Sequence, residues 1–117
     1  MLIEKISFGS IVIDGKKYNE DIIIEKGKVK IREKEKSRKY KHIYNHTPLT
    51  VEENIPWECE TLVIANGFYG ALPITEQVIE EGKKRGVRIK TIRTTELPEV
   101  FNKFDISKTN FIIHLTC

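Results

Sequence analysis

The run Asn66-Gly67-Phe68-Tyr69-Gly70 is the segment of this sequence best suited to binding chemistry. Glycines let the backbone turn sharply and let another group approach closely, and free amides ahead of a helix attract anions. The run lacks both the lysine of a P-loop and the glycine spacing of a dinucleotide-binding loop. It therefore predicts a loop at which these residues contact a ligand or a protein partner. The alternative is a tight strand-to-helix connection whose two rings pack over the sheet.

Positive charge is concentrated between Glu25 and Lys41, a segment that contains nine Lys and Arg residues but only three Glu residues. Such a strip could bind nucleic acid, with Tyr40 and Tyr44 for stacking, or an acidic protein surface or an anionic metabolite. Cations on the solvent face of a strand are also an ordinary protection of a sheet edge against aggregation. No nucleic-acid-binding motif accompanies the charge, so we expect a solvated edge. Weak nucleic-acid binding through residues 28–41 is kept as an alternative.

The histidines and hydroxyl residues form no catalytic or metal-binding pattern. His42 and His46 have the spacing of the two histidines in an H-E-x-x-H zinc motif, but no glutamate follows His42. No acidic cluster supplies further metal ligands. His114 lies in an apolar run and is predicted to be a hydrogen-bonded core residue. There is neither a G-x-S-x-G elbow nor a recognisable spacing of paired carboxylates. The sequence thus predicts no catalytic residue, no metal and no cofactor.

The elements around the glycine run follow from hydrophobic periodicity. After residue 60 the pattern alternates strand, helix, strand, helix and strand, at 61–65, 74–85, 87–92, 97–104 and 111–115. Pro73 and Gly86 mark the start and the end of the first helix, and Thr94 or Thr95 is expected to cap the second. Right-handed crossovers then make the three strands largely parallel.

The first third of the chain predicts short antiparallel strands. They comprise Ile3 to Phe8, a hairpin from Ile11 to Tyr18 that turns at Asp14-Gly15, an apolar strand at residues 22–24, and an alternating strand at residues 28–32. This meander must add to the central sheet or pack against it. Further on, Thr50 to Glu53 matches a capping box and predicts a short helix, and residues 37–49 are the least regular part.

Composition places all of these elements in one domain, residues 1–117. The chain is 39% hydrophobic and 32% charged, with a net charge of +3, which is ordinary for a folded soluble protein. No apolar run approaches the roughly 20 residues of a membrane helix, and no signal peptide is recognisable. Cys59 and Cys117 form no C-x-x-C motif, which favours a reducing compartment. We expect a cytoplasmic α/β protein of mixed α+β character, with three layers and a mixed central sheet.

Several short motifs, taken in order, also resemble a known family. They are Phe8-Gly9, Asp21-Ile22, Arg32 through Ser37, Gly67-Phe68-Tyr69-Gly70, Thr94-Thr95-Glu96 and the final His114-Leu115-Thr116-Cys117. The set resembles the family of mitochondrial complex I assembly factor 3 and the adipogenesis-associated domain protein, which has many short archaeal and bacterial members. The resemblance implies a three-layer α/β fold with a mixed sheet, and it implies no established catalytic activity.

This chain departs from the family pattern at two places. Ala65 takes the place of the first glycine of the family's loop. The segment Ile43-Tyr44-Asn45-His46 replaces the family's Gly-Thr-Ser-His and keeps only its histidine. A ligand of a relative is therefore not carried over to this chain.

The sequence as a whole predicts a non-enzymatic binding or assembly-factor-like module with a cleft at the Gly67–Gly70 loop. Arg32, Arg38, His46 and Thr94 are the expected polar lining, and Tyr69 is a ring that packs on a partner. The partner is an unidentified protein or a small anionic ligand, and the chain could form a homodimer. The first alternative is an enzyme or carrier that acts on a small anionic metabolite. On the first interpretation, a binding or assembly-factor-like module, alanine at both loop glycines weakens partner capture and leaves the fold largely intact.

Overall fold

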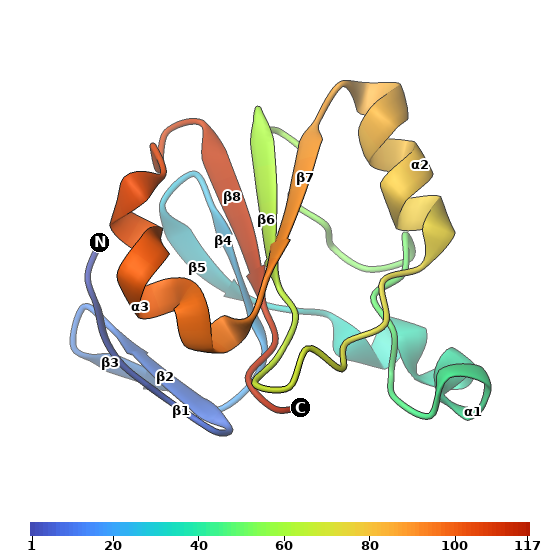
Figure 1. Ribbon diagram of the computed structural model, residues 1–117, viewed down its shortest axis with the longest axis horizontal. Coiled ribbons are helices and arrows are strands. Elements are labelled where there is room, and N and C mark those ends of the chain that lie inside the picture. Colours follow the sequence, from blue (N-terminus) through green and yellow to red (C-terminus); the bar gives the residue numbers. More distant parts are fainter.

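The computed structural model describes all 117 residues and arranges eight strands in two sheets (Figure 1). The smaller sheet is antiparallel and has the order β1 (Ile3–Ser7), β2 (Ser10–Ile13) and β3 (Lys16–Tyr18). The larger sheet has the order β5 (Lys28–Ile31), β4 (Ile22–Glu25), β8 (Thr109–Ile113), β6 (Thr61–Ala65) and β7 (Arg88–Ile92). The predicted meander therefore divides, because its first three strands form a separate sheet and its last two extend the central one.

The larger sheet is mixed, as predicted. Strand β6 pairs in parallel with β7 and β8, whereas β4 is antiparallel to both β8 and β5. Helix α2 (Glu76–Arg85) connects β6 to β7, and a helical segment connects β7 to β8. That segment comprises η2 (Thr94–Glu96), α3 (Leu97–Val100) and η3 (Phe101–Lys103).

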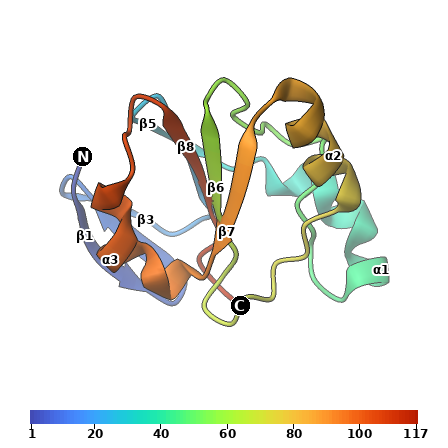
Figure 2. The same ribbon diagram turned by 45° about the horizontal axis from the view of Figure 1, so that its top comes forward.

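The two helical connections cover opposite faces of the larger sheet, which gives the predicted three layers (Figure 2). Side chains alternate along β6, so Val63 packs into one core and Leu62 and Ile64 pack into the other. The first core joins α3 and the smaller sheet to one face of the larger sheet. The second core joins α2 to the opposite face through Val78.

Local signals in the sequence identified two of the chain reversals correctly. Asp14 and Gly15 have φ angles of 49° and 80° and form the hairpin turn between β2 and β3. Helix α2 ends at Gly86, which has a φ angle of 70° and lies in the left-handed region.

Three local predictions were wrong. Thr50 to Glu53 forms a turn instead of a helix, because the side chains of both residues bind other parts of the chain. Residues expected to be irregular form a 3-10 helix, η1 (Lys34–Tyr40), followed by α1 (Lys41–Tyr44). Thr94 does not cap the helical segment after β7, because its hydroxyl donates to the carbonyl of His114. None of the helices combines the length and the apolar character that spanning a bilayer would require.

Candidate functional site at the end of the larger sheet

Asp21, Arg32 and His114 meet at one end of the larger sheet because of the strand register. Ile22 pairs with Ile31 on β5 and with Ile113 on β8. Since β4 is antiparallel to both neighbours, the residue before Ile22 lies beside the residues that follow these two partners. The amide of Arg32 donates to the carbonyl of Asp21 at 2.9 Å and continues the ladder by one step.

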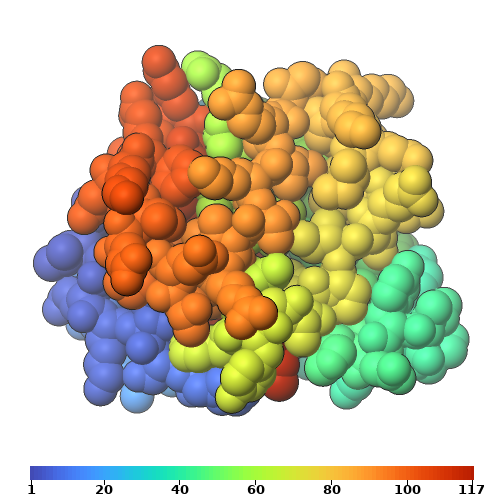
Figure 3. Space-filling view, in the orientation of Figure 1, coloured from blue at the N-terminus to red at the C-terminus, as the bar shows by residue number.

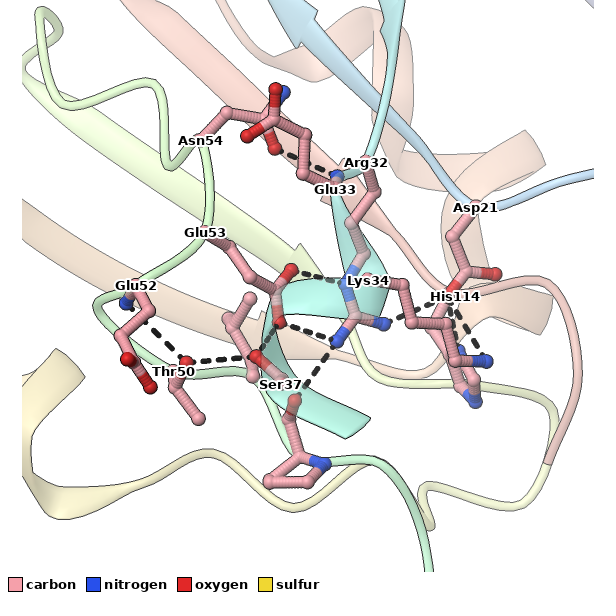
Figure 4. A network of polar contacts seen from close by, with 12 residues as sticks. Asp21, Arg32, Glu33, Lys34, Ser37, Thr50, Glu52, Glu53, Asn54 and His114 are labelled. Carbon is pink, nitrogen blue, oxygen red and sulfur yellow. Dashed lines mark hydrogen bonds and ion pairs between the residues drawn. The ribbon is translucent and has the colours of Figure 1, made fainter. Parts of the chain in front are cut away.

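The guanidinium of Arg32 is the centre of a buried ion network (Figure 4). It donates to Asp21 Oδ2 at 2.8 Å and makes two parallel bonds to Glu53, at 2.6 and 2.9 Å. A further bond of 3.1 Å reaches the carbonyl of Pro48. The side chains of Arg32 and Glu53 are both only 1% exposed. A fork-shaped guanidinium suits such bidentate pairing, and this bonding offsets the cost of removing the charges from water.

Two hydroxyl groups and one imidazole extend the network in opposite directions. Ser37 donates to Glu53, and its oxygen lies 2.7 Å from the hydroxyl of Thr50. On the other side, His114 Nδ1 lies 2.7 Å from Asp21 Oδ2, while Asp21 Oδ1 accepts the amide of Leu115 at 2.9 Å. The predicted role of His114 as a hydrogen-bonded core residue is confirmed.

The network keeps its two central residues charged. Burial raises the pKa of Asp21, but the hydrogen bond and charge of His114, the amide of Leu115 and the charge of Arg32 outweigh it and lower the pKa to about 2. Burial lowers the pKa of Arg32, but Glu53 and Asp21 outweigh that effect and raise the pKa above its ordinary value.

The lowered pKa of Asp21 predicts a loss of stability in acid. Because the pKa is 3.8 in the unfolded chain and about 2 in the folded one, the stabilisation is complete above the first value and is lost as the pH falls through the second. The loss amounts to about 2 kcal/mol. The free energy of unfolding can be measured with urea from pH 6 down to pH 2, a range of about four pH units. It should decline more steeply for the wild type than for Asp21→Asn. Glu20→Gln, which changes an exposed neighbour outside any ion pair, should decline like the wild type. Parallel wild-type and Asp21→Asn curves would contradict this assignment.

A polar pocket of about 220 Å³ opens beside the network. Its lining is polar apart from one leucine and consists of Gly9, Asn19, Glu20, Asp21, Arg32, Lys34, Glu35, Arg38, Leu115 and Thr116. The three cations and three carboxylates of the lining balance each other. Arg38 is exposed and takes part in no ion pair, so it is a free cation at the pocket.

The amides of the glycine loop bind the last residues of the chain. Phe68 donates to the carbonyl of Thr116 at 2.8 Å, and Tyr69 and Ala71 donate to the carbonyl of Cys117 at 2.8 and 3.0 Å. None of the four cavities of the molecule is lined by residues 67–70. The expected cleft at this loop is thus filled by residues 116–117, and the polar pocket lies elsewhere along the same segment, at Leu115 and Thr116.

The rings of the loop, in contrast, lie at the surface. Tyr69 is 69% exposed and Phe8, from the turn between β1 and β2, is 54% exposed. The ring centre of Phe8 lies 5.5 Å from that of Phe68 and 6.3 Å from that of Tyr69. We call these three residues the aromatic cluster. In Figure 3 the yellow-green loop lies at the surface, between the blue N-terminal residues and the red carboxyl end.

The structure brings most of the predicted site residues together in two groups. Gly67 N donates to Thr94 Oγ1 at 2.9 Å, and Thr94 donates to the His114 carbonyl at 2.6 Å, so both residues contact the segment that carries the network. Arg32 and Arg38 line the polar pocket. His46 is exposed beyond α1 and makes no polar contact with the other residues.

No motif in the sequence marks Asp21, Ser37, Thr50 and Glu53 as site residues. One available signal was the position of Asp21 directly before an apolar strand, together with the polar residues Arg32 and His114 near the ends of the strands expected at residues 28–32 and 111–115. The bidentate contact between Arg32 and Glu53 joins residues 21 positions apart, and no local pattern marks it.

The basic strip is largely neutralised within the chain. Lys26, Lys30 and Lys39 form ion pairs with Glu58, Glu25 and Glu52 at 2.7–2.9 Å. Arg32 is buried in the network. This pairing favours the predicted solvated edge over a nucleic-acid-binding surface.

Comparisons with known proteins concern the fold. No family model and no curated protein matches the chain. It is similar to the solved structure of the conserved hypothetical protein PH1505 from Pyrococcus horikoshii OT3, with 26% identity over 100% of both chains and a TM-score of 0.80. A protein described as MT938 is 24% identical over 99% of this chain and 98% of its own, with a TM-score of 0.73. An outer membrane protein from Bartonella henselae is 10% identical over 98% and 94% of the two chains, with a TM-score of 0.61.

The similarities to MT938 and to the Bartonella protein concern the three-dimensional fold alone, because both identities are below 25%. The resemblance to the family of complex I assembly factor 3 stays a prediction.

Proposed function

We propose that this chain is an assembly-factor-like binding module that captures a protein partner through the aromatic cluster, a role that requires no catalysis at the cluster. The observation that carries the proposal is the exposure of Phe8 and Tyr69 beside Phe68. Exposed rings that gather at one place are typical of interaction surfaces, and aromatic side chains dominate binding hot spots. The partner that fits presents apolar or aromatic side chains, and a second copy of this chain is one such partner.

The backbone supports this role by holding the cluster rigidly. The amides of Phe68 and Tyr69 are both bonded to residues 116–117. Those residues follow His114 and Leu115, which are both bonded to Asp21 of the buried network. Rings that are fixed before binding lose little conformational freedom when a partner packs on them. The loop thus contributes a positioned surface in place of the cleft expected from its glycines.

Co-purification tests the proposal. We expect that the chain carrying both Phe8→Ala and Tyr69→Ala captures its partner from the cells of its own organism at least about tenfold less well than the wild type, since two rings of a hot spot are lost. Tyr44→Ala is the matched control, because Tyr44 is also an exposed tyrosine but lies on α1. Sedimentation of the purified chain shows whether the partner is a second copy.

The proposal is wrong if the double variant captures the same proteins in the same amounts as the wild type and as Tyr44→Ala. It is also wrong if the control loses the partner and the double variant keeps it.

The polar pocket favours a second candidate function, the binding of a small polar molecule. Arg38 offers an unpaired cation, and the buried Arg32 fixes the floor of the pocket. Because the lining is charge-balanced, a ligand with both a carboxylate and a cationic or hydrogen-bonding group fits it better than a simple anion. Thermal unfolding with and without such ligands tests this function, since bound ligand must stabilise the folded chain.

A further inference from the structure

Thr116 is the last member of a line of polar groups that leads from the network into the polar pocket. Asp21 Oδ2 lies 2.7 Å from His114 Nδ1, and His114 Nε2 lies 3.4 Å from the hydroxyl oxygen of Thr116. Asp21 and Thr116 both line the pocket. The order carboxylate, imidazole, hydroxyl is the order of groups in an acyl-transfer triad.

The surroundings of Asp21 determine which nitrogen of His114 carries a proton. The carboxylate already accepts a bond from Arg32 and another from the amide of Leu115, and it is ionised at neutral pH. An ionised carboxylate can only accept hydrogen bonds, so the proton between it and the imidazole belongs to Nδ1. In the neutral imidazole, Nε2 is then the acceptor and points its lone pair toward the hydroxyl of Thr116.

The pocket gives a substrate access to the hydroxyl of Thr116, and Nε2 of His114 lies 3.4 Å behind that hydroxyl. Thr116 is half-buried on the pocket wall, whereas His114 is only 6% exposed. The backbone N–H groups of Thr116 and Cys117 make no hydrogen bond within the chain. Lys34 and Arg38 on the same wall can attract the carbonyl oxygen or an acidic group of a substrate.

We propose that Thr116 is an acyl acceptor for esters or thioesters of small carboxylic acids. His114 Nε2 takes the hydroxyl proton while the oxygen bonds to the carbonyl carbon. The bond from that carbon to the leaving oxygen or sulfur then breaks, and the leaving group takes the proton from Nε2. Acyl-Thr116 and a free alcohol or thiol result, and a water molecule activated by the same nitrogen releases the acid and restores Thr116.

This inference goes beyond the proposed binding function and does not depend on it. The aromatic cluster contributes no residue to the pocket lining, so partner capture and acyl transfer can fail separately.

Reaction with p-nitrophenyl acetate tests the inference in the full chain. We expect a burst of p-nitrophenolate and a mass increase of one acetyl group, which peptide mapping places on Thr116. The acetylation should disappear in Thr116→Val, which keeps the shape but lacks the hydroxyl, and should slow at least about 100-fold in His114→Gln. Cys117→Ser should react like the wild type, which excludes acetylation of the neighbouring thiol.

Thr116→Ser separates chemistry from folding. This variant keeps the hydroxyl and should restore acetylation, so the pair Thr116→Val and Thr116→Ser decides the matter even if His114→Gln fails to fold. Acetyl groups found only on lysines, on the amino terminus or on Cys117, or equal acetylation rates for the wild type and Thr116→Val, would overturn the proposal.

Discussion

Replacing Arg32 with methionine is expected to lower the free energy of unfolding by about 3–5 kcal/mol, because it leaves buried carboxylates without their cation. Glu53 loses both of its bonds to the guanidinium, and Asp21 keeps only His114 and the amide of Leu115 as close partners. A domain of this size is stable by about 5–15 kcal/mol, so the variant should be partly unfolded or strongly sensitive to urea. Urea denaturation followed by circular dichroism measures the change.

Two further variants make the result specific to the buried network. Lys30→Met breaks the exposed ion pair with Glu25 and should cost no more than about 1 kcal/mol. Adding Glu53→Gln to Arg32→Met should recover at least about 1 kcal/mol, since it removes one of the unpaired charges. A cost for Arg32→Met as small as that for Lys30→Met would show that the network contributes little.

Replacing Gly67 with alanine is expected to cost about 2–5 kcal/mol, from backbone strain and overpacking together. Gly67 has a φ angle of 106°, and a Cβ atom would overlap the carbonyl group of Cys117 and lie 2.9 Å from the ring of His114. The substitution therefore pushes residues 116–117 off the loop. This differs from the sequence-based expectation that alanine at the loop glycines leaves the fold largely intact.

Gly15→Ala is the matched control, because Gly15 also has a positive φ angle of 80° but faces open space. It should cost only about 1 kcal/mol. Amide hydrogen exchange supplies a second readout, since the amides of Phe68, Tyr69 and Ala71 lose their acceptors when residues 116–117 move. Equal stability losses for the two variants, with these amides still protected in Gly67→Ala, would contradict the packing that the structure shows.

The parts of the fold that were predictable are those with short-range causes. The turn at Asp14-Gly15 depends on two residues that tolerate positive φ angles, and α2 ends where Gly86 allows the left-handed conformation. The parallel strands followed from the alternation of β-type and helix-type periodicity after residue 60. Each single turn, helix or strand signal in this set lies within about a dozen residues.

The candidate site was less predictable because its partners are distant in sequence. Glu53 lies three residues after Thr50, which is the spacing of a capping box, yet its carboxylate binds Arg32 and Ser37. A buried guanidinium offers a carboxylate a stronger bond than a helix amide does, and this overrides the local motif. Asp21 and His114 are 93 residues apart, and only the strand register brings them together.

The glycine loop was also predictable only in part. Its glycines correctly indicated a close backbone approach, but the group that approaches Gly67 is the chain's own carbonyl at Cys117. The nature of the approaching group depends on where β8 ends, and no residue of the loop carries that information. The exposed ring of Tyr69, which lies in one cluster with the half-buried ring of Phe68, remains free for a partner.

The central claim is that a protein partner docks on the aromatic cluster, and photo-crosslinking tests it most directly. The chain would carry benzoylphenylalanine in place of Tyr69 or, as the control, in place of Tyr44, and would be irradiated in cells of its own organism. We predict a discrete covalent adduct with one partner from position 69 and none from position 44, because only the first position lies in the cluster. The same adduct from position 44 with none from position 69 would contradict the claim.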